Sequence, residues 1–188
     1  GFLCEDCRLV STQDTLFTAP LPPREVIPGG FLGPTQHLPR RAQRHTYRRC
    51  VIQGDVDFIF GGAAAWFEDC DVVCIRRADR APGGYATAAS TPEGQKYGYV
   101  FHRCRFTHNG LADGCTYLGR PWREHAATAF IDCQMDECVH PEGFTDWLIT
   151  GQPNRPVTKR YCEYGSTGAG ATAQTRHPGM KLLSAEEA

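Results

Sequence analysis

The stretch "FEDCDV" (67–72) contains a pattern that recurs along this 188-residue chain. In this frame an apolar or aromatic residue is followed three positions later by cysteine, and a second apolar residue stands two positions after the cysteine. The frame also occurs in four other segments: "CEDCRL" (4–9), "YRRCVI" (47–52), "FHRCRF" (101–106) and "FIDCQM" (130–135). Turn-forming residues bound these segments, so each is predicted to be a short β-strand region.

The spacing of the frame decides between the possible all-β folds. Its cysteines are separated by 43, 20, 34 and 29 residues, which excludes helical repeats of fixed period but suits coils joined by variable loops. If consecutive strands pair in parallel and in register, the small apolar thiols stack inside a narrow interior. An antiparallel sandwich would need even strand spacing and tight hairpin turns, which the sequence lacks. We therefore predict a parallel β-solenoid whose inward, mostly reduced cysteines are Cys7, Cys50, Cys70, Cys104 and Cys133.

Composition limits the partners and the cofactors. The chain has 20 Lys and Arg against 21 Asp and Glu, so no basic field favours nucleic acid or an anionic membrane. No apolar run approaches the roughly 18 residues of a membrane span. The ten cysteines are dispersed, and "CEDC" (4–7) is a lone pair without a second pair at zinc-finger spacing. We expect neither a metal nor a cofactor.

Three polar islands accompany the predicted strands: "STQDTLF" (11–17), "GDVDFIFGG" (54–62) and "TYLGRPWRE" (116–124). Strands of adjacent coils lie about 4.8 Å apart, so islands distant in sequence can share one outer face. Two carboxylates, an amide, a guanidinium and an indole would then line a groove. Taken singly, each has a structural explanation: Arg120 could pair with Asp57 for stability, Trp122 could pack, and the Gln13-Asp14 pair could form a turn.

The blocks "QDTL" (13–16), "DFIFG" (57–61) and "LGRPW" (118–122), followed by "GFTDW" (143–147), resemble the pectin methylesterases, also called pectinesterases. The resemblance covers nearly the whole chain and is weakest across residues 18–45. It implies an all-β fold, the right-handed parallel β-helix, in agreement with the repeats. It also implies hydrolysis of the methyl esters of galacturonate units in pectin, with release of methanol and pectate.

The resemblance implies a role for each polar residue. Asp57 would be the nucleophile, and Asp14 would be the general acid and then the general base. Gln13 would donate a hydrogen bond to the oxyanion, and Arg120 would pair with Asp57. Two close carboxylates cannot both ionise cheaply, so a guanidinium beside one of them would decide which stays charged.

The resemblance also implies that Trp122 and Phe60 stack on sugar rings, which makes methyl-esterified homogalacturonan the expected partner. Two other function classes stay open at this point. One is a non-catalytic polysaccharide-binding β-helix, and the other is a different pectin-active enzyme, such as a polygalacturonase or a lyase. A serine hydrolase is disfavoured because the sequence has no Gly-x-Ser-x-Gly motif.

Residues 18–45 interrupt the repeats with six prolines and three glycines, so they cannot form a central strand. We expect a surface loop insertion that packs through its apolar side chains. Because it connects the strands of Asp14 and Asp57, it is expected to cover the groove. The apolar side chains are Val26, Ile27, Phe31 and Leu32.

The extent of the chain generates further expectations. We expect residues 1–188 to form one partial β-helix domain, because family members carry earlier coils and a further glutamine. Ser184 and Glu187 form a capping box, which predicts a helix that starts where the sequence stops. The isolated chain is therefore expected to be inactive or very weakly active and prone to associate, and the full-length protein to be monomeric. A cell-wall substrate favours export, whereas ten unpaired thiols favour a reducing compartment.

Overall fold

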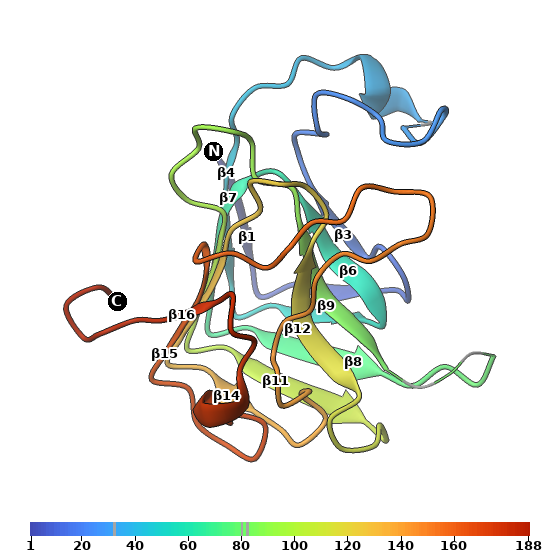
Figure 1. Ribbon diagram of the computed structural model, residues 1–188. Coiled ribbons are helices and arrows are strands. Elements are labelled where there is room, and N and C mark those ends of the chain that lie inside the picture. The colour runs from blue at the N-terminus through green and yellow to red at the C-terminus, as the bar shows by residue number, and fades with distance from the viewer. Residues whose placement is uncertain (32, 80, 82) are drawn as a thin grey trace.

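The computed structural model describes residues 1–31, 33–79, 81 and 83–188. The chain winds through successive coils, and a typical coil contributes one strand to each of three sheets (Figure 1). Neighbouring strands in every sheet pair in parallel. This arrangement is a parallel β-helix, as the cysteine frame predicts.

Strands from successive coils lie side by side in each sheet. The seven-stranded sheet contains, in spatial order, β1 (Phe2–Glu5), β4 (Arg44–Arg48), β7 (Ala64–Glu68), β10 (Tyr99–His102), β13 (Thr128–Ile131), β15 (Tyr161–Tyr164) and β16 (Lys181–Leu182). The five-stranded sheet contains β14 (Gln134–Met135), β11 (Arg105–Asn109), β8 (Asp71–Ile75), β5 (Val51–Gly54) and β2 (Arg8–Val10). The four-stranded sheet contains β12 (Thr116–Pro121), β9 (Gly84–Ala89), β6 (Val56–Gly61) and β3 (Leu16–Thr18).

Each coil turns from the seven-stranded to the five-stranded sheet at the residue that precedes the frame cysteine. These corner residues have φ between 50° and 54°, in the left-handed region that non-glycine residues seldom adopt. They are Asp6, Arg49, Asp69, Arg103 and Asp132. The sequence frame therefore encodes the corner as well as the two strands that flank it.

The corner residues alternate in charge from coil to coil. Arg49 donates two hydrogen bonds of 2.8 Å to Asp6, and Arg103 donates bonds of 2.9 and 3.0 Å to Asp69. Exposed pairs of this kind contribute about 0.2–1 kcal/mol each. The row of corner ion pairs is therefore a modest source of stability, and its regular alternation of charge matters more than its strength.

In four of the five frames the opening residue is aromatic and points into the interior, where the four rings form a stack from coil to coil. The ring centroids of Tyr47 and Phe67 lie 4.8 Å apart, those of Phe67 and Phe101 4.4 Å, and those of Phe101 and Phe130 4.9 Å. The planes of each pair lie within 8° of parallel. Aromatic pairs contribute about 0.5–1.5 kcal/mol beyond the area that they bury.

The thiol column lies beside the aromatic column. Cys50, Cys70, Cys104 and Cys133 are buried, which confirms their predicted inward direction. Cys7 is exposed, but its thiol donates to the carbonyl two residues earlier, as the four buried thiols do. Cys7 belongs to the first coil, and no other described coil covers its outer side. All ten cysteines are unpaired in the structure.

A buried ion pair continues the aromatic column beyond Phe130. Glu163 occupies the position in register with Phe130, and its carboxylate accepts bonds of 2.7 and 3.1 Å from Arg176. Arg176 also donates to the carbonyls of Pro141 and Gly170, so the enclosed guanidinium is well satisfied. Removing one partner of such a pair typically costs about 3–5 kcal/mol.

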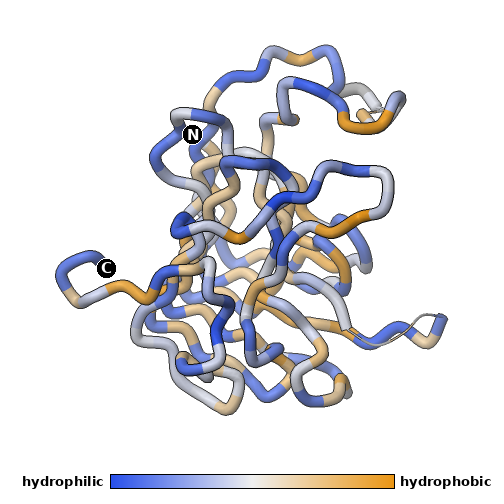
Figure 2. The backbone as a smooth tube through the Cα atoms, viewed as in Figure 1, coloured by the Kyte–Doolittle hydropathy of each residue, from blue (hydrophilic) through white to orange (hydrophobic). Residues whose placement is uncertain are grey.

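Hydrophobic residues recur along the coil stack, and hydrophilic residues dominate much of the projecting loops (Figure 2). A long connection joins β3 to β4 and extends away from the stack, with one short 3-10 helix, η1 (Pro34–His37) (Figure 1). Leu32 of this insertion lies outside the described residues. None of the helices in the described ranges is long and apolar enough to cross a membrane.

The C-terminal segment contains the second short 3-10 helix, η2 (Ala173–Thr175). The helix predicted to start at Ser184 is present only as a turn. The capping bond forms, because the Glu187 carboxylate accepts from the backbone of Ser184 at 3.2 Å.

The thiol column predicts the redox state of the protein. Titration of the denatured chain without reductant should recover nearly all ten thiols, because consecutive cysteines are held as packed side chains. Titration of the native chain should label Cys7 first, because it is the exposed member. Recovery of four thiols or fewer, equivalent to three disulfides, would contradict the stacked column.

Candidate active site

The register of the four-stranded sheet brings Asp14 beside Asp57. Leu16 of β3 pairs with Ile59 of β6. Asp14 and Asp57 each lie two positions before these paired residues, so they adjoin each other. The backbone N–H of Asp14 donates to the carbonyl of Val56 at 3.1 Å. Asp14 and Asp57 both have left-handed φ values, 55° and 49°, a conformation that aspartate tolerates better than most residues.

Arg120 of β12 holds the Asp57 carboxylate in a two-pronged ion pair. Nε donates to one carboxylate oxygen at 2.9 Å, and a terminal nitrogen donates to the other at 2.6 Å. Both residues are only 8% exposed. The guanidinium carbon lies 3.7 Å from the ring centroid of Tyr85 and 4.3 Å from that of Trp147. Aromatic contacts and the fork together fix the orientation of the cation.

The second carboxylate holds a proton more readily than a free aspartate does. Desolvation and then the negative charge of Asp57 raise the pKa of Asp14 from 3.8 to about 6, against a smaller lowering effect of Arg120. The residue as a whole is exposed, so solvent screens part of this effect. The direction of the shift still separates the two aspartates, because only Asp57 has the guanidinium fork.

Gln13 precedes Asp14 in the loop between β2 and β3 and is exposed. Its side-chain amide makes no hydrogen bond to the described part of the chain. The amide can therefore donate to a ligand without breaking a hydrogen bond to the described residues.

Aromatic side chains form one flank of the site. Trp122 and Phe60 meet edge to face, with centroids 5.8 Å apart, and Phe17 lies 5.1 Å from Phe60. The insertion contributes Phe31, which is 8% exposed and meets Trp122 at 6.4 Å. The insertion thus packs on this aromatic flank, which we name the Trp122 flank.

Sequence reasoning missed four residues of this site. Tyr85 and Trp147, which enclose the Arg120 guanidinium, received no role, although Trp147 belongs to the quoted block "GFTDW". Arg123 and Arg155 also lie beside the tryptophans. The signal available for Arg123 was its position directly after "LGRPW", whereas Tyr85 and Arg155 lie in segments without a recognisable motif.

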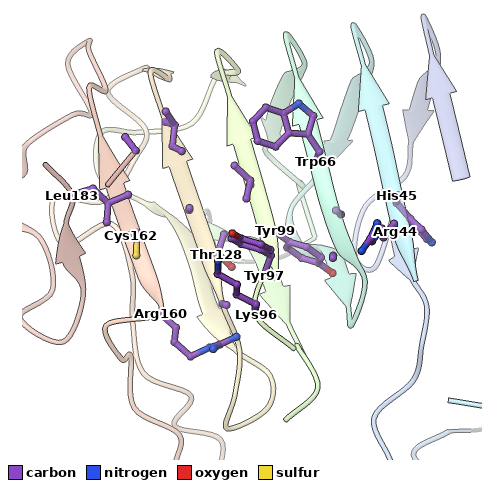
Figure 3. Close-up of a pocket in the computed structure, with 18 of the residues that line it drawn as sticks. Arg44, His45, Trp66, Lys96, Tyr97, Tyr99, Thr128, Arg160, Cys162 and Leu183 are labelled. Atoms are coloured by element: carbon purple, nitrogen blue, oxygen red, sulfur yellow. The ribbon is translucent and has the colours of Figure 1, made fainter. Parts of the chain in front are cut away.

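A large groove lies elsewhere, on the outer face of the seven-stranded sheet (Figure 3). Its volume is about 730 Å³, and its lining includes Trp66, Lys96, Tyr97 and Arg160. None of the six predicted site residues lines it. Within the described ranges, no cluster of three or more His, Cys, Asp or Glu side chains could hold a metal ion.

Comparison with known proteins identifies the family of the chain. Residues 31–188 match the pectinesterase family. The chain belongs to the pectinesterase family. It is 34% identical over 164 residues to a probable pectinesterase/pectinesterase inhibitor of Arabidopsis thaliana, covering 79% of this chain and 26% of that protein. Gln13 and Asp14 precede the matched residues.

Solved structures of pectin methylesterases have the same fold. The enzyme PemA from Erwinia chrysanthemi is 27% identical, with a TM-score of 0.74, covering 98% of this chain and 53% of that one. A pectin methylesterase in complex with a hexasaccharide is 27% identical, with a TM-score of 0.73 and the same coverage. The right-handed parallel β-helix and the family resemblance are confirmed. The chain spans about half the length of these structures and about a quarter of the curated relative.

The raised pKa of Asp14 predicts a specific pH dependence of stability. The folded state binds the Asp14 proton more tightly than the unfolded state does, since the pKa is about 6 against 3.8. The stabilisation of the fold that comes from this tighter proton binding is complete below pH 3.8 and is lost as the pH rises through 6. The free energy of unfolding of Asp14→Asn, relative to the unsubstituted protein, should therefore increase between pH 4 and pH 7.

Urea denaturation at several pH values measures this difference. Asp113→Asn is a suitable control, because Asp113 is exposed and lies outside the site. If the difference in free energy of unfolding between Asp14→Asn and the unsubstituted protein does not change with pH, the native fold does not perturb the pKa of Asp14.

Proposed function

We propose that this chain carries the catalytic groups of an esterase that hydrolyses the methyl esters of galacturonate units in pectin. The observation that carries the proposal is the buried, fork-held carboxylate of Asp57 beside the proton-holding Asp14. Membership of the pectinesterase family and the hexasaccharide bound by a solved relative support the substrate class.

In the first half of the reaction, a carboxylate oxygen of Asp57 attacks the carbonyl carbon of the methyl ester. The resulting oxyanion accepts a hydrogen bond from the Gln13 amide, an interaction worth roughly 3 kcal/mol per donor. The bond to the methoxy group then breaks, and Asp14 transfers its proton to the departing oxygen. The products of this half are methanol and an anhydride that links Asp57 to the galacturonate.

In the second half, water hydrolyses the anhydride. Asp14 is now a carboxylate and takes a proton from the water molecule. At the same time the water oxygen attacks the galacturonate carbonyl carbon. The bond to Asp57 breaks, which regenerates the Asp57 carboxylate beside Arg120 and a protonated Asp14. The net reaction converts one ester and one water into one methanol and one galacturonic acid unit, without a cofactor.

The surroundings of the two aspartates explain why their roles are not interchangeable. A nucleophile must be ionised, and the two donors of Arg120 favour the ionised form of Asp57. A general acid must hold its proton at the working pH, and the raised pKa of Asp14 serves that purpose. On the Trp122 flank, the faces of Trp122 and Phe60 supply apolar surface for sugar rings. One copy of the chain contains all these groups, in keeping with a monomer.

Substitution of the nucleophile tests the proposal directly. In the protein that carries these residues, Asp57→Asn should abolish methanol release from methyl-esterified pectin, because an amide is a far poorer nucleophile. Pectin binding should persist, and circular dichroism should verify that the β-helix is intact. Asp71→Asn is a matched control, since Asp71 also accepts a two-pronged ion pair, from Arg105, but on the five-stranded sheet.

The two variants together decide the role of Asp57. Activity of Asp57→Asn within a few-fold of the unsubstituted protein would show that Asp57 is structural. Formation of new reducing ends or unsaturated products, in place of methanol, would point to a polygalacturonase or a lyase instead.

The shape of the Arg120 side chain provides a second test. Arg120→Lys should lower the rate by about tenfold or more, because one ammonium cannot make both charged hydrogen bonds to Asp57. Lysine also lacks the planar group that lies between Tyr85 and Trp147. The acidic limb of the pH–rate profile should move to higher pH. A slower enzyme with an unchanged profile would mean that Arg120 does not control the charge of Asp57.

A further inference from the structure

The groove on the outer face of the seven-stranded sheet has a floor that strand register builds. Thr46, Trp66, Val100, Ala129 and Cys162 pair in one continuous row across β4, β7, β10, β13 and β15, and all five line the groove. Neighbouring strands lie about 4.8 Å apart, so the row extends for about 19 Å along the stack of coils. This length suits an extended polymer segment better than a compact molecule.

Three cations stand at one edge of this floor. Arg44 is the first residue of β4, Arg160 directly precedes β15, and Lys96 lies in the segment that enters β10. Because the strands are parallel, all of them begin at the same edge of the sheet (Figure 3). The three strands are the first, third and fifth of the row, so the backbone positions of the cations recur at intervals of about 10 Å.

Neutral groups hold two of these cations in place. The Arg160 guanidinium donates to the backbone carbonyls of His125 at 3.0 Å and Gln95 at 2.8 Å, and it has no ion pair to a described residue. The charged nitrogen of Lys96 lies 4.7 Å from the ring centroid of Tyr97. Both cations are thus positioned at the groove without being neutralised.

The lining of the groove contributes little negative charge. Among its described residues the one side-chain carboxylate is Glu187, which contacts the ammonium of Lys181, so this charge is already compensated. Neither Arg44 nor Lys96 makes an ion pair within the described ranges, and both are exposed. The groove therefore has a surplus of positive charge, although the whole chain has a formal charge of -1. An anionic ligand complements it.

Exposed aromatic side chains indicate which kind of anion fits. Trp66 projects from the floor and is 37% exposed, and Tyr97, beside Lys96, is 58% exposed (Figure 3). Ligand sites typically combine aromatic surface with a small number of polar or charged groups, and sugar rings pack on aromatic faces. An acidic polysaccharide matches both the cations and the aromatic surface, and the reaction proposed above produces one.

We propose that this groove, which we name the Trp66 groove, binds a de-esterified stretch of polygalacturonate at a second site away from Asp57. Its defining residues are Arg44, Trp66, Lys96, Tyr97 and Arg160. The inference rests on the proposed function, because the bound polyanion is the polymer that the esterase leaves behind. The groove keeps the protein attached to hydrolysed polymer while the Asp57 site, on the four-stranded sheet, acts on an esterified region.

Binding of polygalacturonate tests the groove without turnover. In the protein that carries these residues, calorimetry should show affinity for fully de-esterified decagalacturonate lowered by about tenfold or more when Arg44→Gln and Lys96→Gln are combined. Added salt should weaken binding to the unsubstituted protein more than binding to this double variant, because the variant has lost two charges. Methanol release from methyl-esterified trigalacturonate, which is too short to reach both sites, should stay unchanged.

A matched control removes the same charge elsewhere. Arg8→Gln combined with Arg105→Gln takes two exposed arginines from the five-stranded sheet, and affinity for decagalacturonate should not change. Trp66→Ala should weaken binding without altering its salt dependence. Equal losses in the two double variants, or unchanged affinity when Arg44 and Lys96 are replaced, would overturn the proposal. Poly-L-glutamate that binds as tightly, with the same dependence on these cations and on Trp66, would overturn a polysaccharide as the occupant.

The same measurements separate this inference from the proposed function. Loss of decagalacturonate affinity on replacement of Arg44 and Lys96, combined with no methanol release by the unsubstituted protein, would refute the esterase and keep the groove as a polygalacturonate site. Methanol release that requires Asp57, combined with unchanged decagalacturonate affinity in that double variant, would refute the groove and keep the esterase.

Discussion

In-register parallel pairing of the coils is the constraint on which this structure depends. Because successive strands of the seven-stranded sheet pair residue for residue, identical positions of the repeat fall into continuous columns. Parallel phenyl rings and thiols can fill those columns only while the register holds. A slip of one residue would send each interior side chain to the surface, so packing and register enforce each other.

The candidate site uses the same constraint for chemistry. Asp14 and Asp57 are 43 residues apart in sequence, and strand pairing makes them neighbours. Arg120 then reaches Asp57 from a strand two places further along the four-stranded sheet. Rigid, hydrogen-bonded strands position these groups more accurately than free loops would, which suits a reaction that needs two carboxylates in different protonation states.

Features that repeat along the sequence or match a known motif could be predicted from it. Features whose geometry depends on a single side chain could not. Four cysteines and the Asp57–Arg120 pair were predicted because each sits in a recognisable frame or block. The exposure of Cys7 depends on what covers its coil, which the local frame does not encode. Tyr85 and Arg155 reach the site through register and loop path, and neither leaves a local signature.

The alternating corner charges described above limit how such a solenoid can change length. Arg49 lies between Asp6 and Asp69, and Arg103 between Asp69 and Asp132. Removal of one coil would place two like charges side by side at a corner, whereas removal of two adjacent coils would preserve the alternation. The coil after Asp132 has glycine, Gly165, at this corner with φ of 63°. A neutral corner accepts either charge as its neighbour, so growth or exchange of coils one at a time is least restricted there.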